Sequence, residues 1–370
     1  MRIDRIRLRT LQLRLMEPFR ISSGETFHRR IMLLVMDTDE ATGHAECVAG
    51  EAPNYSYETN ETAQYALEAW LIPAVLGLDF HEPGEVAAAL DGAARGHNMA
   101  KAAIEMAAWD VAARARGESL ARMLGGDRTR VPAGVSIGLQ PDLDTLFQKV
   151  RQFIDRGYLR VKLKIAPGQD VDMVRAVRAE FPDLPLTVDA NAAYGAGDLD
   201  RLCELDALNL LLIEQPFPED DLLLHAELQR RIDAPVCLDE SITSPARCRE
   251  AIALGAGRVV NIKPGRVGGH TASLAIHDLC RDAGWPVWIG GMLESGIGRA
   301  HNVALASLPN VLLPGDTSAS RRYWARDIVR PEFTLNDDGT VSVPTAPGIG
   351  VDVDEAFLEE IEESRREFTA

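Results

Sequence analysis

The spacing of apolar and polar positions changes along the chain. The first 55 residues alternate the two, as in "IDRIRLRTLQLRL", and "IMLLVMDTDEATGHAECVA" is typical of two strands joined by a polar turn around Asp39–Gly43. Helical periodicity follows at residues 58–76, at 82–91 and in "NMAKAAIEMAAWDVAARARG", which ends at Gly117. Strands followed by helices predict an α+β unit.

From about residue 131, short apolar runs alternate with helix-like segments. Eight such runs follow: "AGVSIG", "LRVKLKI", "LPLTVDAN", "LNLLLIEQP", "APVCLDES", "RVVNIKPG", "WPVWIGGML" and "VLLPGD". This pattern predicts parallel β/α units, and eight strands is the number that closes a barrel. A doubly wound open sheet is the alternative, but it requires a Gly-rich phosphate turn after its first strand, and "SIGLQPD" is not one.

The chain returns to strand-like pieces after Pro331. "EFTLNDDGTVSVP" and "GIGVDVD" are followed by what we expect to be an acidic final helix. Because this tail is too small to form a core alone, we expect it to pack back on the N-terminal unit. We therefore predict an α+β capping domain at 1–128, a barrel domain at 129–325 and a returning tail at 326–370.

Composition excludes several classes of protein. The 370 residues are 46% apolar and 26% charged, with a net charge of −17, so the basic footprint of a nucleic-acid-binding protein is absent. The five cysteines are scattered without a C-x-x-C pair, which favours neither disulfides nor a zinc site. The start "MRIDRIRLRT" lacks the apolar core of a signal peptide, and no apolar run reaches the roughly 20 residues of a membrane helix. We expect a cytoplasmic protein that binds neither nucleic acid nor membrane.

Ionisable residues recur at the ends of five successive predicted strands. Lys164, Asp189, Glu214, Asp239 and Lys263 are 25, 25, 25 and 24 residues apart, one β/α unit per step. A single acidic strand end often only caps the next helix, and an isolated K-x-K pair is typical of an edge strand. Five such groups in phase favour an active site, because barrel enzymes keep theirs at the carboxyl ends of the strands.

Three converging carboxylates without Cys or His suit a hard divalent cation. Oxygen ligands favour Mg²⁺, with Mn²⁺ or another divalent cation as the alternative. Lys162 and Arg266 supply positive charge near the two strand-end lysines, so we expect lowered lysine pKa values suited to proton abstraction. A cation that binds a carboxylate, with a base on each side of the α-carbon, indicates proton abstraction through an enediolate, as in the enolase superfamily.

The pieces "KLK", "VDAN", "IEQPF", "LDES" and "NIKPGRVGG" make the sequence resemble the muconate-lactonising subgroup of the enolase superfamily over essentially its whole length. The resemblance implies an α/β fold, a modified TIM barrel (β/α)₇β with an α+β capping domain. It also implies Mg²⁺ at Asp189, Glu214 and Asp239, and catalytic Lys164 and Lys263. Members that use a histidine base carry it on a late strand. None of the eight histidines here ends a predicted strand, which disfavours the mandelate-racemase type.

Within the subgroup, "GGMLESGIGRAHN" followed by "LPGDTSASRRYW" is most similar to the o-succinylbenzoate synthase / N-succinylamino-acid racemase branch. Dipeptide epimerases usually carry D-x-D in place of the "MLE" segment, and here Met292 and Leu293 make that slot apolar, which suits an acylated or aromatic substrate. The expected activity is racemisation of N-succinylamino acids, dehydration to o-succinylbenzoate in menaquinone biosynthesis, or both. A dipeptide epimerase and a muconate cycloisomerase remain the alternatives.

Further positions follow from the resemblance and from strand ends facing the cavity. Loops around Phe19–Gly24 and Asn54–Tyr57 would close over the substrate, and Asp316 could orient a lysine, with Arg266 in support. The predicted residues that contact the small carboxylate substrate are Ser136, Lys162, Asn191, Gly291, Met292, Leu293, Tyr55 and Phe19. For Tyr55, Phe19 and Tyr323, ordinary packing in the core explains the aromatic residue at least as well as a substrate contact. The resemblance also implies a homo-oligomer, a dimer or an octamer.

Two readings outside this branch are weaker. A non-catalytic protein on the same scaffold predicts loss of some of the five strand-end charges, and all five are present. A sugar-acid dehydratase would need a His–Asp pair or further polar residues for the substrate hydroxyls, whereas the "GGML" segment is apolar.

Overall fold

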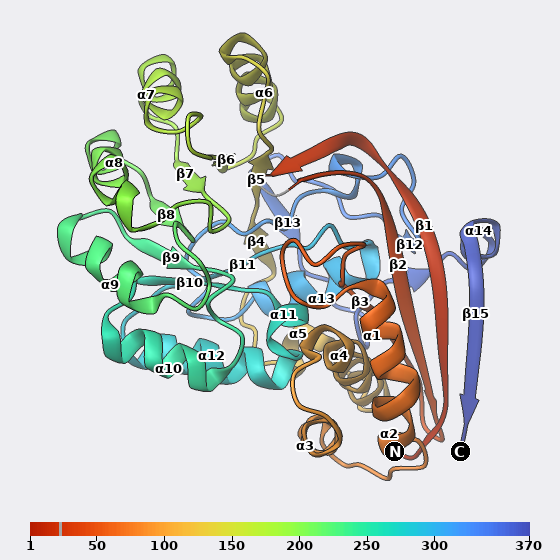
Figure 1. Ribbon diagram of the computed structural model, residues 1–370. Coiled ribbons are helices and arrows are strands. Elements are labelled where there is room, and N and C mark those ends of the chain that lie inside the picture. Colours follow the sequence, from red (N-terminus) through yellow and green to blue (C-terminus); the bar gives the residue numbers. More distant parts are fainter. Residues whose placement is uncertain (22–23) are drawn as a thin grey trace.

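The computed structural model describes residues 1–21 and 24–370, arranged as a curled parallel sheet beside an antiparallel one (Figure 1). Ser22 and Ser23, part of the loop expected to close over the substrate, lie outside the described residues. The N-terminal elements are β1 (Ile3–Ile21), β2 (Gly24–Thr38), β3 (Thr42–Cys47), α1 (Asn60–Ala66), α2 (Ile72–Val75), α3 (Pro83–Ala93), α4 (Asn98–Ala115) and α5 (Leu120–Met123). With the last strand, β15 (Glu362–Thr369), they form a unit that we call the cap.

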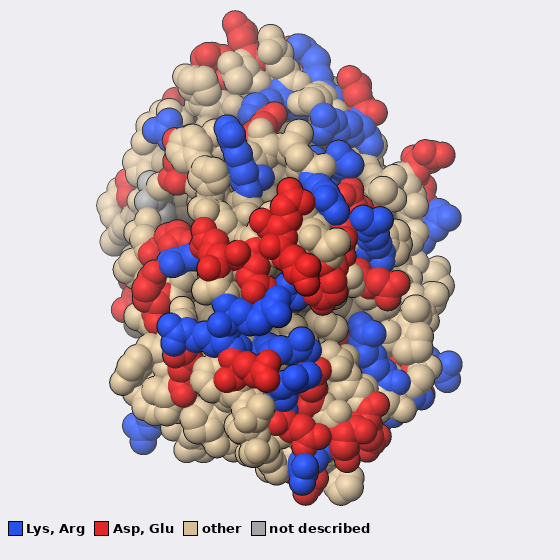
Figure 2. Space-filling view, turned by 90° about the vertical axis from the view of Figure 1, so that its right-hand side faces the viewer, with Lys and Arg blue, Asp and Glu red and all other residues tan. Residues whose placement is uncertain are grey.

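The antiparallel sheet of the cap has the order β15-β1-β2-β3 within the described residues. Its inner face packs on the helices, and α4 lies against β3 and β2. The outer side carries intermixed charges of both signs, as Figure 2 shows for the face over β1 and β15. Ion pairs there include Arg5–Asp37 and Arg7–Asp37.

Strands and helices then alternate, as the sequence predicted. The short strand β4 (Arg130–Pro132) precedes them and lies outside the parallel sheet. The alternating strands are β5 (Gly134–Ile137), β6 (Arg160–Lys164), β7 (Leu186–Asp189), β8 (Leu212–Glu214), β9 (Val236–Leu238), β10 (Val259–Ile262) and β11 (Val287–Ile289). The helices are α6 (Leu143–Asp155), α7 (Val171–Glu180), α8 (Leu199–Cys203), α9 (Leu222–Arg231), α10 (Pro245–Leu254), α11 (Pro264–Val267), α12 (His270–Asp282) and α13 (Gly296–Ala306). Strands β5 to β11 pair in parallel in chain order and are buried, which explains their continuous apolar runs.

The predicted eighth strand, "VLLPGD", is reduced to two parallel bridges. Val311 pairs with Val287 of β11, and Gly315 pairs with Ala133 beside β5, so the segment closes the ring of strands. Pro314 lies between these bridges and has no N–H to give to a continuous ladder. The expected modified (β/α)₇β barrel with an α+β cap is confirmed.

The C-terminal tail differs from its prediction in one element. It contains β12 (Val329–Arg330), β13 (Thr340–Ser342), β14 (Asp352–Val353) and α14 (Glu355–Ile361). The acidic final helix ends at Ile361, and the last residues form β15, which pairs antiparallel with β1. Most side chains of β15 are exposed, so the sequence has no alternation of apolar and polar residues that would predict this strand. The boundaries at 128/129 and 325/326 stay predictions.

The β1–β2 hairpin reaches from the cap to the carboxyl end of β5 (Figure 1). Leu139 N–H donates to the carbonyl of Arg20 at 3.0 Å. A Cβ on Gly138 would lie 2.6 Å from the same carbonyl oxygen, so only glycine allows this approach. The hairpin therefore sits over the end of the barrel where the strand-end charges gather. Among the described residues, no helix is long and apolar enough to cross a membrane.

Candidate active site

Three carboxylates from neighbouring strands meet at the carboxyl end of the barrel. Asp189 and Glu214 end β7 and β8 as register partners, and Asp239 directly follows β9. One oxygen of each lies within 4.8 Å of the other two, and all three side chains are buried. Buried carboxylate oxygens at this spacing suit a hard divalent cation, so these residues fit the expected metal.

Two lysines flank the carboxylates from opposite sides. Lys164 ends β6, and Lys263 directly follows β10, so the strands that carry the acids lie between them. The Nζ of Lys164 lies 2.6 Å from Asp189 Oδ2, and the Nζ of Lys263 lies 2.8 Å from Asp239 Oδ2. The arrangement places one lysine ammonium group on each side of the carboxylate cluster.

The buried charges shift one another's pKa values. Burial would raise the pKa of Asp189, but Lys164 and Lys162 hold it below its usual value. Burial and the Asp189 carboxylate raise the pKa of Glu214. Burial would lower the pKa of Lys263, yet Tyr55 and the neighbouring acids raise it above its usual value.

The expectation of a lowered lysine pKa is therefore wrong for Lys263 in the protein alone. The reason is that anionic groups outweigh the desolvation of its ammonium group. A divalent cation among the same carboxylates would oppose their field.

Asn191 links Lys164 to an acid that the sequence argument did not single out. Lys164 Nζ donates to Asn191 Oδ1 at 2.6 Å, and Asn191 Nδ2 donates to Glu240 Oε1 at 2.9 Å. Asn191 has a φ of +44°, a left-handed conformation that Asn tolerates better than most residues. Burial and nearby Asp189 raise the pKa of Glu240 to about 7. The relay fixes the direction of the Lys164 ammonium group.

Tyr55 and Arg266 complete the surroundings of Lys263. Lys263 Nζ donates to the Tyr55 hydroxyl at 3.0 Å and lies 4.5 Å from the centre of its ring. The same hydroxyl donates to Asp239 Oδ1 at 3.0 Å and accepts from Arg266 at 3.1 Å. Arg266 also pairs directly with Asp239. A residue of the cap is thus hydrogen-bonded to the barrel lysine.

Lys162 and Asp316 form a buried pair deeper in the barrel. Lys162 Nζ lies 2.9 Å from both Glu214 Oε2 and Asp316 Oδ2. Asp316 also accepts from Arg160 at 2.9 Å. Ser136 is the register partner of Lys162 on β5 and is buried. Asp316 thus contacts Lys162 rather than either strand-end lysine.

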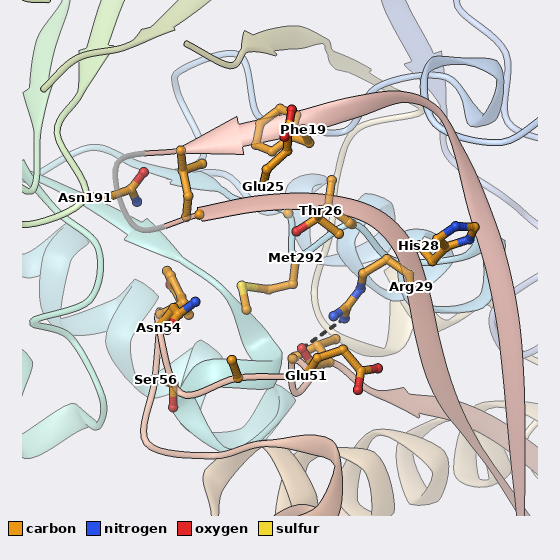
Figure 3. A pocket seen from close by; sticks show the side chains of 18 of the residues that line it. Phe19, Glu25, Thr26, His28, Arg29, Glu51, Asn54, Ser56, Asn191 and Met292 are labelled. Atoms are coloured by element: carbon orange, nitrogen blue, oxygen red, sulfur yellow. Dashed lines mark hydrogen bonds between the residues drawn. The ribbon is translucent and has the colours of Figure 1, made fainter.

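A cavity of about 440 Å³ opens above the two lysines, between cap and barrel (Figure 3). Its lining includes Lys164, Lys263 and six of the predicted contact residues, namely Phe19, Tyr55, Asn191, Gly291, Met292 and Leu293. Figure 3 shows Phe19 on the β1–β2 hairpin, Asn54 on the loop after β3 and Met292 between them. The two remaining predicted contact residues, Ser136 and Lys162, are not part of this lining.

Comparison with known proteins identifies the family. A model described as "Mandelate racemase / muconate lactonizing enzyme, N-terminal domain" matches residues 5–125, and "Enolase C-terminal domain-like" matches residues 145–357. The chain belongs to the enolase superfamily. The resemblance inferred from the motifs is confirmed, and the site described above occupies the carboxyl end of an enolase-superfamily barrel.

Two curated members of the superfamily cover nearly the whole chain. The o-succinylbenzoate synthase of Geobacillus stearothermophilus is 49% identical over 359 residues, 96% of this chain and 95% of that protein. The N-succinylamino acid racemase of an Amycolatopsis species is 49% identical over 362 residues, 98% of both chains. A crystal structure of an enolase-superfamily member from Listeria innocua superposes with a TM-score of 0.96 at 41% identity, covering 99% of both chains. These similarities place the chain in the branch that the motifs indicated.

Several residues of the site were not predicted from the sequence. Asn261 Nδ2 donates to Glu214 Oε1 at 2.7 Å, and it stands out as a polar residue within the apolar run of β10. Glu240 lies within the quoted "LDES" segment. Arg29 and Glu58 line the cavity from the cap. No local sequence pattern predicts this, because the barrel residues that line the same cavity are far away in the sequence.

Proposed function

We propose that this enolase-superfamily enzyme abstracts the proton α to a substrate carboxylate and forms an enediolate. The observation that carries the proposal is the placement of Lys164 and Lys263 on opposite sides of one carboxylate cluster. The activities that fit are those of the two relatives, racemisation of N-succinylamino acids and dehydration to o-succinylbenzoate in menaquinone biosynthesis.

We assign Asp189, Glu214 and Asp239 as the residues that would hold Mg²⁺, with Mn²⁺ as an alternative. The bound cation would supply positive charge for the substrate carboxylate as negative charge develops on it. Lys162 would neutralise excess negative charge behind the cluster, because it already contacts Glu214. Arg266 would support Lys263 through their shared partners Tyr55 and Asp239.

In racemisation, one lysine takes the α-proton from one face and the other returns a proton to the opposite face. In dehydration, Lys164 takes the α-proton and returns it to the departing hydroxyl, which leaves as water, while Lys263 stabilises the charge. Both reactions share the enediolate, so one site can serve both. Asn191 and Glu240 orient Lys164, and Tyr55 orients Lys263.

The upper cavity would receive the acyl or ring portion of the substrate. Gly291, Met292 and Leu293 form its barrel wall, and Phe19 contributes an aromatic side chain from the hairpin. This lining offers no carboxylate pair at Met292 and Leu293 to hold a free amine, which supports an acylated substrate. Ser136 would act from below, beside Lys162.

The test is turnover by the purified protein with Mg²⁺. One enantiomer of N-succinylphenylalanine should lose optical rotation, and the cyclohexadiene precursor of o-succinylbenzoate should be dehydrated, each with loss of activity in EDTA and recovery with Mg²⁺. Failure of both reactions would overturn the proposal and direct attention to dipeptides and muconates. The relative kcat/KM values would show which reaction is faster.

We further propose a cytoplasmic homo-oligomer, a dimer or an octamer. The five cysteines, all within the described residues, are free thiols, with Cys248 Sγ 3.6 Å from Cys280 Sγ, and free thiols are typical of a reducing compartment. Light scattering of the purified protein would measure its mass, and a monomeric mass would contradict the assembly proposal.

A further inference from the structure

Two buried acids of the cap contact barrel helices at their N-termini. Glu46 of β3 accepts hydrogen bonds from the backbone N–H groups of Ser295 and Gly298, at 3.1 and 3.3 Å, and from the Ser295 hydroxyl. Glu105 of α4 accepts from the backbone N–H groups of His270 and Thr271, at 2.7 and 2.9 Å. At α12, where the N-cap residue Gly269 has no side chain, Glu105 takes the place of a local cap. At α13, the Ser295 hydroxyl already accepts from Ile297 N–H, and Glu46 adds a second acceptor from a different domain.

The barrel sequence makes space for these carboxylates. A Cβ on Gly298 would lie 2.8 Å from both Glu46 Cδ and Glu294 Cβ, and a Cβ on Gly269 would lie 2.0 Å from Glu105 Oε2. Both glycines therefore allow a cap carboxylate to approach the barrel backbone. Each contact therefore depends on a carboxylate of the cap and on a glycine of the barrel.

Glu46 differs from Glu105 in its position relative to the substrate cavity. It comes two residues before Val48, the first cavity-lining residue after the β1–β2 hairpin. It binds Ser295, two residues after Leu293, where the Gly291–Leu293 stretch of the barrel lining ends. Met292 and Leu293 belong to this barrel wall, and the side chain of Met292 lies in the middle of Figure 3. Glu46 thus joins the two walls beside the cavity.

The barrel wall is a strained segment that depends on its anchors. Leu293 has a φ of +59°, a left-handed conformation that is unfavourable for a bulky residue and persists only when the surroundings impose it. Met292 N–H donates to Glu294 Oε2 at 2.8 Å, and Asn302 Nδ2 holds the other Glu294 oxygen at 2.9 Å. Glu46 anchors the next residue, Ser295.

We propose that Glu46 is a positioning residue that sets the shape of the substrate cavity by holding the Gly291–Leu293 wall against the cap. The burial of Glu46 and Ser295 and the nearby guanidinium group of Arg29 support this role. Glu46 is 2% exposed, and Arg29, which lines the cavity and binds the carbonyls of Val48 and Ala49, lies in its electrostatic field. Because Glu46 does not touch the reacting groups, its effect is on substrate binding and not on the proton-transfer step.

The kinetic test compares Glu46→Ala with Glu46→Gln and with the matched control Glu105→Ala. This arm rests on the proposed function. We expect Glu46→Ala to raise KM for N-succinylphenylalanine about tenfold with kcat changed less than about threefold, since loss of a cap alters loop energies by this order. Glu46→Gln retains an acceptor oxygen, so its KM should lie close to the wild-type value. Glu105→Ala should lower Tm to a similar extent and leave KM unchanged.

A second arm does not depend on activity. Amide hydrogen exchange should increase in residues 291–298 and 48–56 of Glu46→Ala and remain at the wild-type level there in Glu105→Ala. Unchanged exchange in both segments, or an equal KM increase in Glu105→Ala, would overturn the positioning role. If the wild-type protein does not turn over the substrate but the exchange result holds, the proposed function fails and the role of Glu46 stands.

Discussion

The hydroxyl of Tyr55, in the cap, accepts a hydrogen bond from Lys263 Nζ, in the barrel, at 3.0 Å. The centre of the Tyr55 ring lies 4.5 Å from the same ammonium group. The cap therefore forms part of the surroundings of one of the two proposed bases. Through this contact, the loop after β3 takes part in a site whose other proposed catalytic residues lie at the ends of barrel strands.

Replacing Tyr55 by Phe separates these two contacts. The ring remains over Lys263, but the hydroxyl shared by Lys263, Arg266 and Asp239 is lost. We expect kcat/KM to fall about tenfold or more, since hydrogen bonds to charged groups contribute about 1.5–3 kcal/mol, with little change in Tm. Steady-state kinetics at saturating Mg²⁺ measure this effect. Tyr55→Ala should be more damaging, and wild-type kinetics in both variants would show that Tyr55 only packs.

Asp239→Asn tests the assignment of the metal ligands. The variant removes one negative oxygen from the triad and leaves Lys263 and Arg266 without their common partner. We expect Mg²⁺ affinity to fall by about 100-fold or more, with turnover lost in parallel, because even outer partners of a metal contribute 10–100-fold. Calorimetric titration with Mg²⁺ measures the affinity. Asp142→Asn, at the exposed cap of α6, is the control. Wild-type affinity in Asp239→Asn would remove this residue from the site.

Glu46 should make stability depend on pH. Burial raises its pKa from 4.5 to about 7, with Glu294 raising it further and Ser295 lowering it. Between these two values the folded protein binds one more proton than the unfolded chain, so the free energy of unfolding falls as pH rises through this interval, by up to about 3 kcal/mol. Glu46→Gln lacks this titration.

Urea denaturation of both proteins at pH 4.5 and pH 8 measures the difference. Glu46→Gln should gain stability relative to the wild type as pH rises. A difference between the two proteins that stays constant over this range would show that Glu46 is ionised throughout.

Gly138→Ala tests the docking of the hairpin on the barrel. The new Cβ would lie 2.6 Å from the carbonyl oxygen of Arg20, a backbone atom that cannot rotate away. We expect a loss of about 1–3 kcal/mol in stability together with a raised KM, because the hairpin carries Phe19 into the cavity. Gly84→Ala, with nothing within 4 Å of its new Cβ, should be neutral or stabilising. Equal behaviour of the two variants would contradict the docking argument.

The barrel half of the site could be predicted because its geometry repeats. Each parallel strand ends at the same edge, so residues 25 apart, such as Lys164 and Asp189, are neighbours in space. The cap residues follow no such period. Glu46 and Ser295 are separated by almost the whole barrel, and only the folded chain brings them together.

Weak local signals explain the two differences in secondary structure. The segment "EESRREFT" forms the edge strand β15 although it is almost entirely charged or polar, because β1 supplies the backbone partners. The closing segment of the barrel is apolar, as predicted, but Pro314 limits it to isolated bridges. Both outcomes depend on pairing with strands remote in the sequence.

The most direct measurement uses Lys164→Ala and Lys263→Ala beside the wild type. Each enantiomer of N-succinylphenylalanine is incubated in D₂O with Mg²⁺, and exchange at the α-carbon is followed by proton NMR. Because the lysines lie on opposite sides of the carboxylates, the wild type should exchange both enantiomers. Each variant should exchange only one, and a different one for each variant. Racemisation by either variant, or exchange of the same enantiomer by both, would contradict the assignment of the two lysines as opposed bases.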